Sequence, residues 1–170
     1  MRRLADESFG AATFRELCAR IGEPEYVDRW LWRFSRPDGT VLIVGAGEDG
    51  GMTVGAAVLS TCWWDTVHRH DAGDDDSYAA EQRAYDDAYD DALRAAEAVA
   101  GQPDFSGRDQ GTYPHRWALW RGRTGLFVVQ QSAYDLQFGV DVNYWVRPWT
   151  ARRIEPTEPF IDWLSKPPSD

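Results

Sequence analysis

Two groups of short strand-like segments, separated by one long helical segment, restrict the folds open to this 170-residue chain. In each group, three segments have apolar side chains that alternate with polar ones or run together, and turns separate them. The six segments are residues 27–35, 41–45, 52–60, 115–121, 126–131 and 139–147. Strands joined by short turns pair antiparallel with their neighbours, so each group predicts a three-stranded meander.

Three helices are expected around these strands. The longest covers residues 77–100 and is followed by Gly101, a residue type that commonly ends helices. Its apolar stripe, at helical spacing, consists of Tyr85, Tyr89, Ala92, Ala96 and Val99. Shorter helices are expected at residues 13–21, which open with a capping-box pattern, and at residues 158–165.

These elements predict a single α+β domain over residues 1–170. Its mainly antiparallel sheet is built from two three-stranded meanders, with one long central helix and shorter N- and C-terminal helices. An acidic loop, residues 63–76, is expected between the first meander and the central helix. The chain is 43% hydrophobic and 14% aromatic, which provides the apolar area that a packed core needs.

The negative charge is concentrated in one segment. Residues 65–104 contain 12 Asp or Glu and three Arg, which gives a net charge of -9 out of -10 for the chain. Such a field opposes binding to nucleic acid or to an anionic membrane and favours a basic partner. The longest uncharged stretch has 15 residues, fewer than the ~20 that span a membrane as a helix. The N-terminus carries acid where a signal peptide is apolar, so a cytoplasmic protein is expected.

Metal-type side chains gather at one place. His68 and His70 are followed by Asp74, Asp75 and Asp76, and imidazole and carboxylate groups are common metal ligands. No second cluster follows at a spacing typical of a metal-binding family. We therefore expect a solvated loop here and predict no metal site.

Motifs for covalent or cofactor chemistry are missing from the sequence. Cys18 and Cys62 lie in no catalytic motif, and the chain contains no Gly-x-Ser-x-Gly nucleophile elbow. A Gly-containing turn at residues 45–47 is followed by acid, which would repel a phosphate. No catalytic residue and no cofactor are predicted.

The expected central helix carries a continuous negative band. Its members recur at i, i+4 spacing and are Asp86, Asp87, Asp90 and Asp91. Ion pairs of Arg83 with Asp87 and of Asp90 with Arg94 would each stabilise the helix by about 0.2–0.5 kcal/mol. Two interpretations stay open: a solvated face that keeps an aromatic-rich protein soluble, or an electrostatic landing site that speeds encounter with a basic protein.

Two adjacent tryptophans precede this band. On an extended backbone Trp63 and Trp64 point to opposite sides, so one can join the core while the other is exposed beside the acidic loop. An exposed tryptophan there would suit an interface hot spot, whereas both side chains packing under the loop is the alternative. The predicted partner-binding residues are Trp63, Trp64, Asp74, Asp75, Asp76, Asp86, Asp87, Asp90 and Asp91.

The order of the expected elements over residues 10–165 resembles the secretion-chaperone-like α+β fold. That pattern is helix, three strands, helix, two or three strands, helix, and the resemblance implies a dimer that binds a secreted client. The compact acidic domain with a charged loop and helix and no catalytic motif is also similar to bacterial toxin-immunity proteins, which are stoichiometric inhibitors. No sequence motif carries either resemblance, so neither assigns a role to a particular residue.

These observations predict a non-catalytic acidic protein-binding module, most specifically an immunity-type inhibitor that neutralises a basic toxin or effector. One alternative is a secretion-type chaperone that binds an extended client and forms a homodimer. Another is a small-molecule-binding protein or enzyme with its site between helix and sheet, among Trp30, Trp32 and Tyr85.

Overall fold

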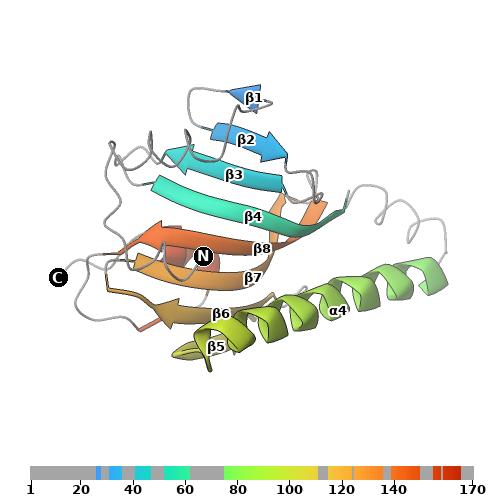
Figure 1. The fold of residues 1–170 in the computed structure, drawn as a ribbon. Coiled ribbons are helices and arrows are strands. Elements are labelled where there is room, and N and C mark those ends of the chain that lie inside the picture. The colour runs from blue at the N-terminus through green and yellow to red at the C-terminus, as the bar shows by residue number, and fades with distance from the viewer. Residues whose placement is uncertain are drawn as a thin grey trace.

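In the part of the chain that the structure describes, the protein is an α+β structure with one antiparallel sheet (Figure 1), and helices α4 and α5 cover its two faces. The computed structural model describes residues 26–27, 31–35, 41–46, 52–61, 75–110, 115–123, 125–135, 139–149, 155–157 and 159–165. The predicted class, mixed helix and antiparallel sheet, is confirmed. The helix expected at residues 13–21 lies outside the described residues.

The described strands form a single sheet in which every neighbouring pair is antiparallel. They are β1 (Tyr26–Val27), β2 (Leu31–Ser35), β3 (Val41–Ala46), β4 (Met52–Thr61), β5 (Phe105–Arg108), β6 (Arg116–Arg121), β7 (Gly125–Asp135) and β8 (Gly139–Pro148). The order across the sheet is β1-β2-β3-β4-β8-β7-β6-β5. Strands β1 to β4 are therefore added in chain order from one edge of the sheet to its middle. Strands β5 to β8 are added in chain order from the other edge, and the two groups meet where β4 pairs with β8.

Several strands differ from the expectation, and β7 continues to Asp135, beyond the expected end at residue 131. Instead of one strand over residues 27–35, the structure has β1 and β2 paired with each other, with Val27 opposite Trp32. The alternation of side chains continues through this segment, and alternation alone does not mark where a backbone reverses. Strand β5 is not predicted at all, because Phe105 is its only large apolar residue.

Helix α4 (Asp75–Ala100) connects the two groups of strands. It begins two residues before the expected residue 77, so Asp75 and Asp76 belong to its first turn and not to the acidic loop. Acidic residues are favourable at this position in the chain, because the N-terminal end of the helix dipole is positive. Gly101 ends the helix with a positive φ of 78°, and its N–H donates to the carbonyl of Glu97 at 2.8 Å.

Helix α4 packs along one face of the sheet, and its first turns extend past the strands (Figure 1). Its buried stripe is Tyr85, Tyr89, Ala92, Ala96 and Ala100. Val99, which the sequence places in the stripe, is 77% exposed. It lies beside the line from Ala96 to Ala100, and these alanines continue the stripe at i, i+4 spacing to the helix end. None of the described helices is long and apolar enough to cross a membrane.

The opposite face of the same strands is also buried. The side chains of Ala118 and Trp120 contact the α4 cluster, whereas those of Trp117 and Leu119 contact α5 (Phe160–Ser165). Trp117 and Phe160 stack with ring centroids 4.2 Å apart and an interplanar angle of 7°. Strands buried on two faces lose the alternation of apolar and polar residues, which explains the continuous apolar run in β7.

Replacing Gly107 with alanine is expected to lower the free energy of unfolding by about 1–3 kcal/mol. A Cβ at Gly107 would lie 2.5 Å from Cζ2 of Trp117, an indole that is held by its stack on Phe160 and by Asp109. Chemical denaturation followed by tryptophan fluorescence measures the change. Ser106→Ala, at the exposed neighbouring position, is the control and should cost less than about 0.5 kcal/mol. Equal losses in the two variants would contradict the packing described here.

Candidate functional site

Two of the four band aspartates turn toward the sheet, and we call Asp86 and Asp90 the inner pair. Oδ1 of Asp86 accepts a hydrogen bond from Nε2 of Gln131 at 2.9 Å. The backbone N–H of Arg116 donates to Oε1 of Gln131 at 3.0 Å, and the guanidinium of Arg116 donates to Oδ1 of Asp90 at 2.5 Å. The inner pair is thus bound into a hydrogen-bonded network that joins α4 to β6 and β7.

Arg116 makes a second contact with α4. Its guanidinium carbon lies 4.4 Å from the centroid of the Tyr89 ring, a cation–π geometry. Tyr89 is 2% exposed, and burial raises the pKa of its hydroxyl above the ordinary value, although the positive charge of Arg116 opposes the shift. Arg116 therefore holds α4 on the sheet through two contacts, one with the carboxylate of Asp90 and one with the ring of Tyr89.

His115 lies beside Arg116 and contacts the same helix. The hydroxyl of Tyr85 lies 3.3 Å from Nδ1 of His115. Burial lowers the pKa of His115 below 6.5, and the negative charge of Asp109 only partly offsets the effect. A neutral imidazole with its proton on Nε2 can accept a hydrogen bond from the Tyr85 hydroxyl at Nδ1. The lowered pKa favours the neutral form of His115 and therefore maintains this contact near pH 7.

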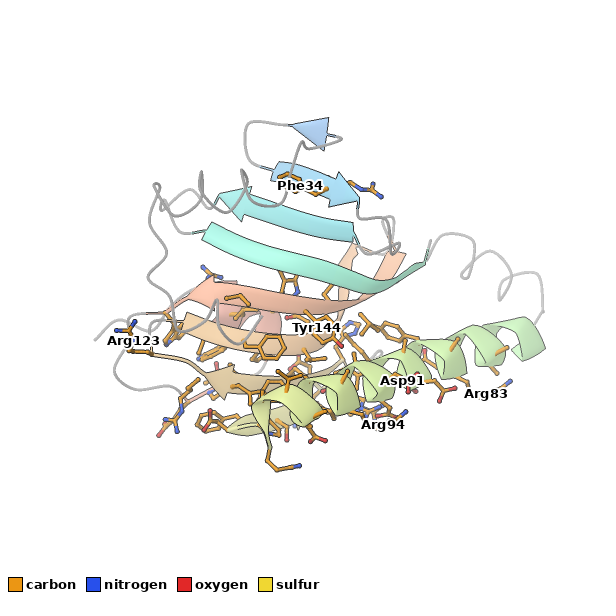
Figure 2. All side chains as sticks on the ribbon, viewed as in Figure 1. Phe34, Arg83, Asp91, Arg94, Arg123 and Tyr144 are labelled. Atoms are coloured by element: carbon orange, nitrogen blue, oxygen red, sulfur yellow. The ribbon has the colours of Figure 1, made fainter. Side chains whose placement is uncertain are left out.

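The other two aspartates, Asp87 and Asp91, are exposed, and we call them the outer pair. Asp91 forms an ion pair with Arg94 one turn along the helix, and the side chain of Asp91 remains 72% exposed. The expected pairing of Arg94 with Asp90 is wrong, because Asp90 turns to Arg116 on β6. Figure 2 labels Asp91 and Arg94, together with Arg83, along α4.

The network also continues along the helix. The hydroxyl of Tyr144 on β8 donates to the carbonyl of Ala92 at 3.1 Å, and Nε1 of Trp120 on β6 donates to the carbonyl of Gly101 at 2.8 Å. Both donors come from the sheet, and Tyr144 is labelled in Figure 2. Helix α4 is therefore held at its middle and at its C-terminal end as well as at the inner pair.

Several of the residues predicted to bind a partner, and the two histidines of the metal-type cluster, cannot be assigned to this site. Trp63, Trp64 and Asp74 lie outside the described residues, as do His68 and His70. Asp75 and Asp76 lie in the first turn of α4. The described residues contain no group of three or more side chains that could hold a metal ion.

The helix–sheet contact proposed as a small-molecule site is packed around Tyr85. This side chain is 6% exposed and belongs to the buried cluster under α4. Trp32 lies in β2 and Trp30 lies outside the described residues. Tyr85 therefore acts as a core residue with a hydrogen bond to His115.

The sheet residues that bind the inner pair, Arg116 and Gln131, are not predicted from the sequence. Arg116 and Gln131 have no motif, and both lie at strand positions where a polar side chain is ordinarily taken as solvent-exposed. One sequence feature points to Gln131. Gln130 and Gln131 directly follow an apolar run, so both amides are buried if the strand continues in the core, and a buried amide needs hydrogen-bond partners.

Comparison of the chain with protein-family models, with curated proteins and with solved structures finds no match. The site is therefore interpreted from its own geometry.

The lowered pKa of His115 predicts a pH dependence of stability. The unfolded chain takes up a proton at His115 as pH falls through about 6.5, whereas the folded chain resists it, so stability present above pH 6.5 is lost below it. His115→Asn keeps an amide oxygen as acceptor for Tyr85 but does not titrate. The difference in unfolding free energy between wild type and this variant should shrink between pH 8 and about pH 5. A difference that stays constant over this range, measured by urea denaturation, would contradict the assignment.

Proposed function

We propose that this protein is a non-catalytic, acidic protein-binding module that acts in the cytoplasm. The most specific form of the proposal is an immunity-type inhibitor that neutralises a basic toxin or effector. The observation that carries it is the position of the outer pair, Asp87 and Asp91, on the solvent side of a helix that the sheet holds in place. A net charge of -10, concentrated around this helix, would attract a basic surface over a long range.

Rigid presentation supports the proposal. Charges on a helix that is held along its length lose little freedom when a partner binds, and this lowers the entropic cost of association. A stoichiometric inhibitor needs complementary charge and shape and requires no acid or base with a tuned pKa. Among the described groups, those with shifted pKa values are Tyr89, Tyr144 and His115, and all three contact the helix–sheet packing.

The outer and inner pairs provide a matched test. Asp87→Asn/Asp91→Asn and Asp86→Asn/Asp90→Asn each remove two negative charges from neighbouring positions of one helix. We expect the outer substitution to slow association with the captured basic partner by about threefold to tenfold at low salt, because it changes the landing surface. The inner substitution should change the association rate less and should lower the unfolding free energy.

The measurement uses affinity capture from native cell extract with the tagged full chain, followed by association kinetics with the purified captured protein. Wild-type association should slow steeply as salt concentration rises, since exposed charges are screened. A rate that is independent of salt, or outer and inner variants that slow association equally, would contradict the proposed surface.

A secretion-type chaperone is the second candidate, and one observation favours it. Strand β5 is the last strand of the described sheet, and Ser106 and Arg108 on it are exposed. An extended client could add to such an edge through backbone hydrogen bonds, and a homodimer belongs to the same alternative. In that case neutralising Asp87 and Asp91 would leave client binding unchanged.

A further inference from the structure

Helix α5 lies in a socket on the sheet face opposite α4. The socket is lined by aromatic and aliphatic side chains of the sheet and of the residue after β8: Trp117, Leu119, Leu126, Val128, Trp145 and Trp149. From α5, Phe160, Trp163 and Leu164 enter it, at i, i+3 and i+4 spacing, and none is more than 8% exposed. This is the arrangement by which an amphipathic helix fills a groove of a separate protein.

The socket also holds both ends of the helix. The carboxylate of Asp109 accepts the N–H of Phe160 at 3.0 and 3.1 Å, and the guanidinium of Arg147 donates to the carbonyl of Leu164. A negative group at the N-terminus and a positive group at the C-terminus complement the helix dipole. Oδ1 of Asp109 also accepts from Nε1 of Trp117 at 3.2 Å, so a contact within the socket positions this carboxylate.

Helix α5 depends on this socket for its structure. It has six residues, and isolated helices shorter than about 12–15 residues are marginal in water. Its outward residues, Ile161 and Asp162, are exposed, whereas its three largest buried side chains, Phe160, Trp163 and Leu164, face the socket. Away from the socket the segment is therefore not expected to remain helical.

The fit leaves polar atoms unsatisfied. Nε1 of Trp149 is buried without a hydrogen-bond partner, and its ring packs on Trp163 with centroids 4.8 Å apart. Oε1 of Gln130, directly opposite Trp117 in the strand register, is also buried without a partner. Unsatisfied buried groups reduce the stability of the docked state, and this favours reversible docking.

We propose that the socket is an exchangeable helix-docking site, and that the α5 segment of a second copy of this chain can replace the resident one. Every contact made by Phe160, Trp163 and Leu164 is available to an identical segment supplied by another molecule. The resident α5 has the advantage of its covalent connection, which corresponds to an effective concentration on the order of millimolar. Exchange is therefore expected when the resident helix is weakened or the protein is concentrated. The proposal is independent of the acidic face, which lies on the other side of the sheet.

The test uses the full chain and a fluorescein-labelled peptide of residues 155–165. Phe160→Ala in the chain weakens the resident helix and leaves the socket residues unchanged. Fluorescence anisotropy should show the peptide binding this variant at least tenfold more tightly than wild type, because the internal competitor is weakened. Leu164→Ala is a second variant with the same expected direction if Phe160→Ala folds poorly, as judged by circular dichroism.

Two controls define the socket. A peptide carrying Phe160→Ala should bind at least tenfold more weakly than the native peptide. Adding Asp109→Ala to the Phe160→Ala chain should also weaken binding, because it removes the acceptor for the helix N-terminus. The proposal is overturned if the native peptide binds wild type and both α5 variants equally, if it binds none of them at millimolar concentration, or if the control peptide binds as well as the native one.

Discussion

The orientation of α4 about its own axis is the constraint on which the account of this protein depends. Apolar burial of Tyr85 and Tyr89 places the helix on the sheet, but apolar contact is not directional. The polar contacts are directional, because Asp86 and Asp90 each have one partner on the sheet. Together they determine which carboxylates turn inward and which face solvent.

This orientation divides one negative band into two structural roles. Asp86 and Asp90 attach the helix to the sheet. Asp87 and Asp91, each one residue further along, remain exposed, and these are the residues proposed to meet the partner. Adjacent helix residues differ by about 100° in direction, so a small difference in sequence position separates an internal contact from a surface charge. The same sheet presents α5 on its other face, where the aromatic socket provides a second and chemically different surface.

The sequence predicted the antiparallel α+β class because turn residues and alternation are local signals. It predicted the helix end at Gly101 for the same reason. It did not predict that β6 and β7 are buried on both faces, since Trp117 and Trp120 look alike until α5 is known to cover one side. Nor did it pair Asp90 with Arg116, 26 residues away, because nothing local distinguishes this partner from Arg94.

A double-mutant cycle on Asp90 and Arg116 tests the central claim most directly. Unfolding free energies are measured for wild type, Asp90→Asn, Arg116→Gln and the double variant. Both side chains are partly exposed, so we expect a favourable coupling of at least about 0.5 kcal/mol, near the middle of the range for such pairs. A coupling of zero within error would show that this contact does not help to hold α4 in the orientation described, and would contradict the role assigned to Asp90.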